Sequence, residues 1–517
     1  MDEPTDPPSR SILVASLGLV VLGLVLRFLL LRSSVGPADG DESVVLLMAK
    51  DMLAGHFETF FWGQEYGGSQ EAFLVSLLAR IGVPLRWGGE IVTIGLSVAA
   101  SWLLWRLARL IAGDSVARLA CALYWATPIL YVWLSQKERG FYGSSAVSCL
   151  AALLFATRFL RSGRIADALG LGLATGSAIW SSPQALYLLV PLGLWLGGHL
   201  LRTRRWHLLR AAPVAGIAAI IGGAPWLWTN AHTRLQSLQR PPTPVTAPGE
   251  RLSLYWRIAL PQVSGFKLPY DPIRWIGTRA FLVPHLGLVA LALVGVVLLA
   301  RRAPWVPLAA AWHPILFTAL GTSFYVSEAR YLFLLWPTAA LALAAAAVRF
   351  GKDVGAVALA LLCGLLAVVG YNGLVSFAAA HPRAVDLEIP DAGLVVAAME
   401  EMGVAFAYAD YWSAYPLEVA SDGDVVATPL YSVRDPRRER QVQAAARSAY
   451  VVHVNGCAEA ALSAAATAAG QAPPERRATV GLYVVLVPQR PIPPENVASL
   501  WAKERGTPRP DLPDCLS

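Results

Sequence analysis

Residues 11–31 read SILVASLGLVVLGLVLRFLLL and contain a single charged side chain, that of Arg27. An apolar helix of about 20 residues is long enough to cross the roughly 30 Å hydrocarbon core of a bilayer. The run is longer than the apolar core of a signal peptide, and no small-x-small cleavage site follows it. The stretch therefore predicts a retained first transmembrane helix, with Arg27 near its outer end as a snorkelling residue.

The rest of the chain has the same character up to about residue 377. The sequence is 56% hydrophobic and only 15% charged over 517 residues, with a mean hydropathy of +0.50, which is outside the range of soluble globular proteins. Long apolar runs predict about eleven transmembrane helices, at approximately 11–31, 88–110, 114–134, 141–160, 165–182, 184–200, 211–229, 277–300, 304–321, 331–348 and 353–377. We expect an all-α polytopic membrane domain over residues 1–377.

Short basic turns separate these runs. Counted from a cytoplasmic N-terminus, each turn on the cytoplasmic side is basic, as the positive-inside rule requires. The cations are Arg106, Arg109 and Arg118; Arg158, Arg161 and Arg164; Arg202, Arg204, Arg205 and Arg210; Arg301 and Arg302; Arg349 and Lys352. The net charge of +7 is therefore explained by membrane topology, and it does not indicate a nucleic-acid partner. Residues 32–87, residues 230–276 and the chain from about 378 onward are expected outside the cytoplasm.

The composition changes after His381. Short β-like runs at Val404–Tyr408, Val425–Ala427, Tyr450–Val454 and Val480–Val487 alternate with helical stretches at 392–402 and 458–469. This pattern predicts a small extracytoplasmic α/β domain at residues 378–490, followed by an irregular tail at 491–517. Cys457 and Cys515 either form a disulfide there or remain free thiols. Arginines outnumber lysines 37 to five, which is typical of a GC-rich bacterial genome and favours a bacterial cytoplasmic membrane.

Acidic residues follow the first span directly, in Asp39-Gly40-Asp41-Glu42, and Glu65-Tyr66-Gly67-Gly68 comes about 24 residues later. Residues 43–53 and 71–85 have the pattern of amphipathic helices at the membrane interface. One interpretation is structural, since acidic residues favour the N-terminal end of a helix. The other is chemical, because these carboxylates are expected at the boundary between water and membrane.

In these motifs the chain resembles the GT-C glycosyltransferases, the superfamily of the protein O-mannosyltransferases and the aminoarabinose transferases. Asp41 and Glu42 match the acidic pair that opens the first outer loop, and Tyr66-Gly67-Gly68 match the later segment of that loop. Ser327-Glu328-Ala329-Arg330-Tyr331, before the run that contains Pro337, matches a basic-aromatic motif. The resemblance implies a GT-C fold and inverting transfer of a hexose or pentose from a polyprenyl phosphate to a lipid, glycan or protein acceptor.

Such a transfer needs a base near the acceptor and cations near the leaving phosphate. Asp41 is the predicted base, and Glu42 either orients it or binds the acceptor. The phosphate candidates are Arg330 with Tyr331 and Lys137 with Arg139, because cations on the outer side are not explained by topology. Their alternative role is interfacial snorkelling. Glu65, Tyr66 and Glu138 are further candidates for binding substrate.

No metal-ligand spacing surrounds His56, His232 or His285, so no metal ligand is assigned, although the resemblance leaves a divalent metal open. Two interpretations are open for Tyr142, Trp180, Tyr187 and Trp226: they line a sugar or lipid cavity, or they belong to the aromatic belt.

The cytoplasmic turns contain no glycine-rich phosphate loop, so the sequence does not indicate a nucleotide-sugar enzyme. The alternative function is a transporter or flippase for a lipid-linked or polar solute, which would place charges at the membrane midplane. A membrane scaffold is a third interpretation, and it leaves the Asp41 loop without a role.

Overall fold

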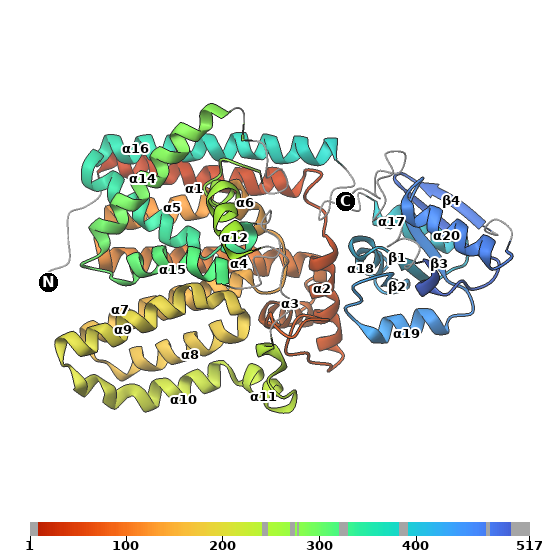
Figure 1. Ribbon diagram of the computed structural model, residues 1–517, viewed down its shortest axis with the longest axis horizontal. Helices are drawn as coiled ribbons and strands as arrows, with labels where there is room; N and C mark the ends of the chain where they lie inside the picture. The colour runs from red at the N-terminus through yellow and green to blue at the C-terminus, as the bar shows by residue number, and fades with distance from the viewer. Residues whose placement is uncertain are drawn as a thin grey trace. The chain divides into compact units, whose positions relative to one another are not determined.

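The computed structural model describes residues 9–239, 247–268, 275–276, 279–319, 329–381, 391–471 and 476–497. The chain forms two compact units (Figure 1). The first comprises residues 1–33, 65–74 and 90–376, and the second comprises residues 34–64, 75–89 and 377–517.

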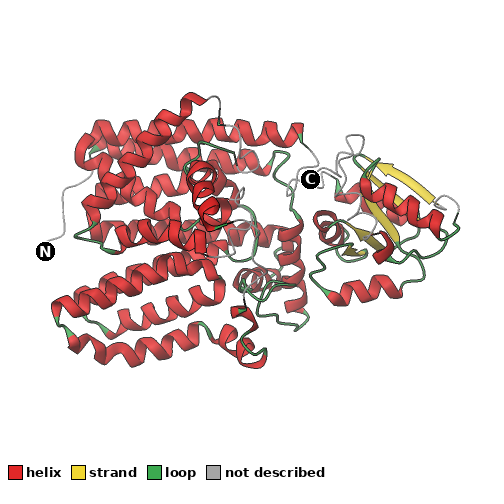
Figure 2. Cartoon of the chain, viewed as in Figure 1, coloured by secondary structure: helices red, strands yellow, loops and turns green. Residues whose placement is uncertain are grey.

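The first unit is helical (Figure 2). Its main helices are α1 (Arg10–Leu31), α4 (Leu85–Ala112), α5 (Asp114–Ala126), α6 (Ile129–Leu134), α7 (Tyr142–Ser162), α8 (Ile165–Ser181), α9 (Leu186–Thr203), α10 (Ala212–Gly222), α11 (Ala224–His232), α12 (Pro248–Leu254), α13 (Leu260–Val263), α14 (Leu282–Leu299), α15 (Trp305–Ala319) and α16 (Leu335–Ala380). The shorter α3 (Gln70–Arg80) lies between α2 and α4 in the chain.

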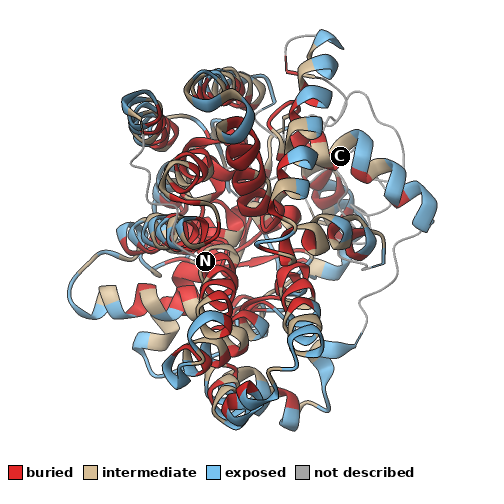
Figure 3. Cartoon of the chain, turned by 90° about the vertical axis from the view of Figure 1, so that its left-hand side faces the viewer, coloured by how far each residue is buried: buried red, intermediate tan, exposed pale blue. Residues whose placement is uncertain are grey.

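Six of the described helices are long and apolar enough to cross a membrane, and a seventh is added if the bent pair at residues 206–232 counts as one span. The protein is therefore a multi-pass membrane protein, while the predicted number of eleven spans is not confirmed. Several predicted runs correspond to shorter helices, such as the 13-residue α5 followed by the six-residue α6. Leu17, Leu24 and Phe28 of α1 have exposed apolar side chains. Figure 3 shows exposed and intermediate positions along the outer sides of the helices. Such surfaces suit contact with lipid.

Two of the predicted runs lie in one long helical segment that has a break between them. Residues 331–348 and 353–377 fall largely within α16, which is broken at Lys352, where φ is +45°. The break coincides with the basic turn predicted at 349–352. The Ser9 hydroxyl, which caps α1, donates to Asp353 at 2.6 Å, so this break lies at the same end of the unit as the start of α1.

Hydrogen bonds also connect other basic turns with neighbouring helix ends. Arg161, at the end of α7, donates to the carbonyl of Leu110 near the end of α4 at 2.6 Å. Arg205, after α9, donates to the carbonyl of Leu160 at 2.8 Å. These contacts bring three of the predicted cytoplasmic turns together, as a common membrane side requires.

Close helix packing in this unit depends on small residues. A Cβ atom at Gly172 of α8 would lie 2.1 Å from the carbonyl oxygen of Ala215, and one at Gly176 would lie 2.1 Å from that of Ala219. The two glycines are four residues apart and so face α10 on one side of the helix. Any larger residue would separate α8 from α10, which is how small-xxx-small patterns act in membrane helices.

The second unit contains α2 (Gly40–Leu53) and a C-terminal α/β domain. The domain's elements are α17 (Ala392–Glu401), β1 (Phe406–Ala409), α18 (Tyr411–Ala420), β2 (Val426–Pro429), α19 (Pro436–Ala444), β3 (Ala449–His453), α20 (Cys457–Ala468), β4 (Arg476–Val480) and β5 (Tyr483–Val487). The sheet order is β2-β1-β3-β5-β4, with β2, β1 and β3 parallel and the other two pairings antiparallel. Buried clusters cover the sheet, one including Met399 and Leu417 and the other including Leu462.

The predicted α/β fold of this region is confirmed, with one local difference. The run Val480–Val487, expected to be a single strand, is a hairpin in which β4 ends at Val480 and β5 begins at Tyr483. Gly481 takes φ +54° at the turn, a conformation that glycine adopts without strain. An apolar run shows where strands lie but not where a short turn divides them.

Candidate active site

The acidic stretch after α1 forms the start of α2. Asp39 is the N-cap: its carboxylate accepts the backbone N–H of Glu42 at 3.1 Å, while the Glu42 carboxylate accepts the backbone N–H of Asp39 at 2.9 Å. This capping box satisfies two N–H groups that the helix leaves without partners. The structural interpretation thus accounts for Asp39 and Glu42, whose side chains are buried.

Asp41 does not take part in the capping box. Its Oδ1 accepts a hydrogen bond of 2.5 Å from the phenol of Tyr411, which lies 370 positions later at the start of α18. Arg434 donates from Nε to the same phenol oxygen at 3.3 Å, and its guanidinium lies 5.0 Å from the Tyr411 ring. Burial, and next the Asp41 carboxylate, raise the pKa of Tyr411 well above its usual value, which keeps the phenol protonated as a donor.

The sheet of the second unit presents these two partners. Tyr411 follows β1 after one residue, Asp410, which caps α18 by accepting the backbone N–H groups of Trp412 and Ser413. Arg434 lies in the segment between β2 and α19. Both therefore extend from the carboxyl edge of neighbouring parallel strands, the edge at which open α/β sheets bind their ligands. Here that edge meets α2.

The loop between α6 and α7 carries three predicted site residues, Lys137, Glu138 and Arg139. All three are at most 4% exposed, so they are buried within the first unit and do not snorkel at its surface. Lys137 and Arg139 lie 5.8 and 5.1 Å from the ring of Trp133. The sequence predicted that these charged residues lie in an outer turn, but it did not predict that they would be buried between helices.

Glu138 is paired with a second buried carboxyl group, that of Glu71 at the start of α3. The two side chains hydrogen-bond each other, which requires a proton on one of them. Glu138 also accepts from the hydroxyl of Thr93 at 3.0 Å, and Glu71 accepts from the backbone and hydroxyl of Ser144 at 2.7 and 2.8 Å. Burial, and next the charge of Glu71, raise the pKa of Glu138 well above its usual value.

A cavity of about 50 Å³ lies beside this loop. Its polar lining comes from Thr93 and Ser97 of α4, Tyr124, Tyr131, Ser135, Lys137 and Tyr142, and its apolar lining includes Leu96, Leu134 and Phe333. Tyr142 therefore lines a cavity, as one of its two interpretations predicted. Trp180, Tyr187 and Trp226 are not among the residues that line it.

Arg27 does not snorkel, and that prediction is wrong. The side chain is 4% exposed and donates to the carbonyls of Gly23 and Trp125 at 3.0 and 2.9 Å and to the Ser135 hydroxyl at 3.0 Å. Its guanidinium also lies 3.6 Å from the Trp125 ring. These partners satisfy most of its donors inside the helical unit, next to the cavity that Ser135 lines.

Arg330 and Tyr331 form a short turn before α16. Arg330 donates to the Tyr331 hydroxyl at 3.4 Å and lies 5.2 Å from its ring. Ser327 and Glu328, the rest of the basic-aromatic motif, lie outside the described residues. The structure brings Arg330 and Tyr331 together, and their phosphate role stays a prediction.

The segment that begins with Glu65 and Tyr66 is anchored at its glycines. The backbone N–H of Gly68 donates to the carbonyl of Ser181 at 2.8 Å, and a Cβ atom at Gly68 would lie 2.7 Å from the carbonyl of Trp180. Glu65 and Tyr66 themselves are exposed. Their substrate-binding role stays a prediction.

Among the described residues, no group of three or more His, Cys, Asp or Glu side chains could hold a metal ion. His285 bonds the hydroxyl of Ser264, His56 is exposed, and the ring of His232 bonds the backbone carbonyl of Trp228. Cys457 is disulfide-bonded and is not a free thiol, and Cys515 lies outside the described residues.

Comparison with known proteins supports the resemblance to the GT-C superfamily. A family model described as dolichyl-phosphate-mannose-protein mannosyltransferase matches residues 71–228, which include the Lys137–Arg139 loop. ArnT from Cupriavidus metallidurans, solved bound to undecaprenyl phosphate, is similar over 94% of this chain and 98% of its own, with a TM-score of 0.57 and 14% identity. The Archaeoglobus fulgidus oligosaccharyltransferase gives a TM-score of 0.47 and 14% identity over 85% of this chain and 68% of its own. No curated protein matches. The chain has an ArnT-like GT-C fold, which confirms the predicted fold class.

Proposed function

We propose that this protein is a membrane glycosyltransferase that moves a sugar from a polyprenyl phosphate to an acceptor outside the cytoplasm, with Asp41 as the general base. The observation that carries the proposal is that the three carboxylates at the start of α2 have different hydrogen-bond partners. Asp39 and Glu42 are used for capping, whereas Asp41 is held by a phenol donor from a distant part of the chain. This donor fixes the orientation of the Asp41 carboxylate at the start of α2.

In the proposed reaction, Asp41 takes the proton of the acceptor hydroxyl or amine as that group attacks the anomeric carbon. The bond from this carbon to the phosphate oxygen breaks, and polyprenyl phosphate leaves with the bonding electrons. One displacement inverts the configuration at carbon, in line with the resemblance. Glu42 contributes by fixing the start of the helix that carries Asp41.

Cations are required where the leaving phosphate gains charge. Lys137 is proposed for this role because it lines a cavity within the region that the mannosyltransferase family model matches. Arg139, Arg330 and Tyr331 are the further phosphate candidates, since arginine can donate two parallel hydrogen bonds to a phosphate. ArnT is known bound to undecaprenyl phosphate, which supports this class of carrier. Glu65, Tyr66 and Glu138 remain proposed substrate contacts, and no metal enters the proposal.

The proposed location is a bacterial cytoplasmic membrane, with a cytoplasmic N-terminus and the α/β domain at residues 378–490 outside. The joined basic turns of α4, α7 and α9 support this orientation. The acceptor is a lipid, a glycan or a protein.

Asp41→Asn tests the proposal against Asp39→Asn. We expect Asp41→Asn to lower transfer by about two to four orders of magnitude, because the amide cannot accept the proton. Asp39→Asn should keep nearly full transfer, since asparagine also caps helices well. The measurement is the transfer rate in proteoliposomes, with expression and thermal stability followed in parallel. Full transfer by Asp41→Asn would remove Asp41 from the mechanism, whereas no transfer by the parent would favour the transporter alternative.

A further inference from the structure

We propose that Tyr411 is a positioning residue for the base, and that the C-terminal α/β domain acts in transfer by holding α2 and the Asp41 carboxylate in place. This inference rests on the proposed role of Asp41. It assigns to the domain a function in the reaction that is separate from binding an acceptor.

The first support is the contact itself. The Tyr411 phenol is 4% exposed and donates to Asp41 Oδ1 at 2.5 Å. A buried phenol that donates to one carboxylate oxygen fixes the rotation of the carboxyl group and so the direction of its lone pairs. The distance is at the short end for an O–H···O⁻ bond, as expected for a charge-assisted one.

The second support is the group behind the phenol. Arg434 donates to the Tyr411 oxygen, and its guanidinium lies 5.6 Å from the ring of Phe61, in the loop after α2. The backbone N–H of Arg434 in turn donates to the hydroxyl of Tyr415 at 2.7 Å. Asp41, Tyr411 and Arg434 therefore form a hydrogen-bonded series that is anchored in the domain.

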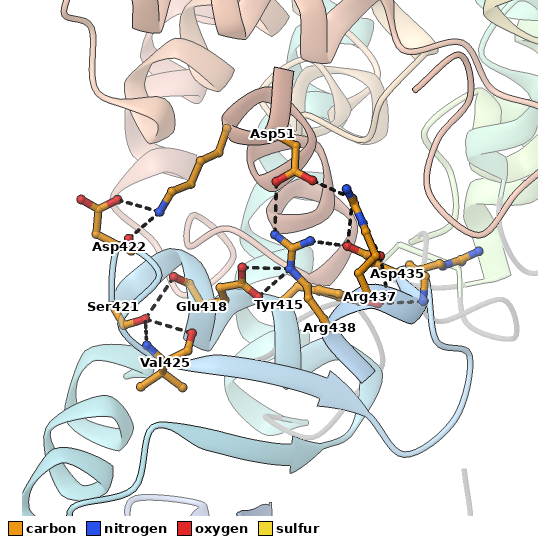
Figure 4. Close-up of polar contacts among 11 residues, drawn as sticks. Asp51, Tyr415, Glu418, Ser421, Asp422, Val425, Asp435, Arg437 and Arg438 are labelled. Atoms are coloured by element: carbon orange, nitrogen blue, oxygen red, sulfur yellow. Dashed lines mark hydrogen bonds and ion pairs between the residues drawn. The ribbon is translucent and has the colours of Figure 1, made fainter. Parts of the chain in front are cut away.

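The third support is the far end of α2, where Asp51 binds two arginines of α19 (Figure 4). Asp51 lies 2.6 Å from Arg437 and 3.6 Å from Arg438. Ten residues separate Asp41 from Asp51, which is about 15 Å along a helix. The domain thus holds α2 at two points far enough apart to fix its direction.

Buried carboxylates hold those two arginines in turn. Arg438 is 10% exposed and binds Glu418 of α18 at 2.8 Å as well as Asp435. Arg437 binds Asp435 at 3.0 Å. Burial opposes ionisation of Asp435, but the bonds from Arg437 and Arg438 outweigh it and lower the pKa of Asp435. The arginines are therefore preorganised to receive Asp51.

A close backbone approach completes the docking of α2. A Cβ atom at Gly40 would lie 3.0 Å from the carbonyl oxygen of Tyr411 and 3.1 Å from Cα of Trp412. Glycine at this position therefore lets the start of α2 rest against the start of α18. This contact places Asp41 within reach of the Tyr411 phenol.

The test compares Tyr411→Phe with Tyr450→Phe. Tyr450 is also a buried phenol of the domain, but it donates at 2.7 Å to the backbone carbonyl of Ile492. We expect Tyr411→Phe to lower kcat about 10- to 100-fold and to leave the KM for the donor within about twofold, because it disturbs the base and not donor binding. Tyr450→Phe should keep kcat within about twofold at a similar loss of thermal stability.

A double variant separates positioning from general damage to the fold. Tyr411→Phe added to Asp41→Asn should cost little more than Asp41→Asn alone. If both tyrosine variants gave the same kcat, Tyr411 would not position the base. Full transfer by Asp41→Asn would instead contradict the proposed function itself.

Discussion

Asp39, Asp41 and Glu42 lie within four positions, yet their carboxylates have different partners. Their place after the first span predicted a site at this point in the sequence, and helix capping was one interpretation of all three without separating Asp39 and Glu42 from Asp41. The partner of Asp41 could not be predicted, because Tyr411 is 370 residues away and no spacing rule connects them. Arg434 was missed for the same reason.

Burial of charge was the second feature that the sequence did not show. Lys137, Glu138 and Arg139 were placed correctly between two helices, but a turn that is polar in sequence is ordinarily exposed. Their burial depends on α3, α4 and α7 packing around the loop, as the bonds of Glu71 and Glu138 to Ser144 and Thr93 show. Arg27 was misjudged likewise, since its partners come from α5 and the segment after α6.

The carboxyl pair leads to a prediction about pH. The pKa of Glu138 is raised in the folded protein, so its stabilising contribution is complete below the usual glutamate pKa of about 4.3 and is lost as the pH rises towards the folded-state value. Glu138→Gln cannot titrate and keeps the neutral form. We expect this variant to lose less thermal stability than the parent between pH 5 and pH 8, by a few degrees in Tm.

The exposed Glu250 provides the control for that prediction. Glu250→Gln should follow the parent at every pH. An identical fall in Tm with pH for Glu138→Gln and the parent would show that Glu138 is ionised in the folded protein at neutral pH.

At the level of elements, the sequence predicted where helices and strands lie better than how long they are. Basic residues marked the turn after α7 and the break in α16, because arginine and lysine end apolar runs and also obey membrane sidedness. Periodicity could not tell a full span from a short buried helix, as at α5 and α6, since both are apolar on most sides. Periodicity also could not show that the apolar run Val480–Val487 is divided between the strands β4 and β5.

The docking of α2 gives a prediction at this scale. Asp51→Asn removes a partner from Arg437 and Arg438 while those arginines remain, and breaking such a partly buried pair should cost about 1–3 kcal/mol. We expect faster amide hydrogen exchange in α2, together with a lower transfer rate. The measurement is hydrogen exchange of the detergent-solubilised full chain.

A second ion pair of α2 supplies the matched control. Lys50 pairs with Asp422 at 3.5 Å, but the Asp422 side chain is 95% exposed, and exposed pairs contribute little. Asp422→Asn should therefore leave exchange in α2 unchanged. Equal protection of α2 in both variants and the parent would contradict a role for Asp51 in holding the helix.

For the whole molecule, composition and charge were sufficient to predict a multi-pass membrane domain with an α/β domain near its C-terminus. Reporter fusions after residues 112 and 380 test the proposed orientation, and they should report from the cytoplasm and the outside, respectively. Two cytoplasmic signals would reverse the assignment of the α/β domain.

The central claim is that the protein uses a sugar carried on a polyprenyl phosphate. The most direct measurement is the release of free polyprenyl phosphate from a native pool of lipid-linked sugars, in proteoliposomes that hold either the parent or Asp41→Asn together with membrane-derived acceptors. The account predicts steady release by the parent, release at least about 100-fold slower by Asp41→Asn, and no transfer when nucleotide sugars replace the lipid-linked pool. Transfer from nucleotide sugars, or equal release by the parent and Asp41→Asn, would contradict it.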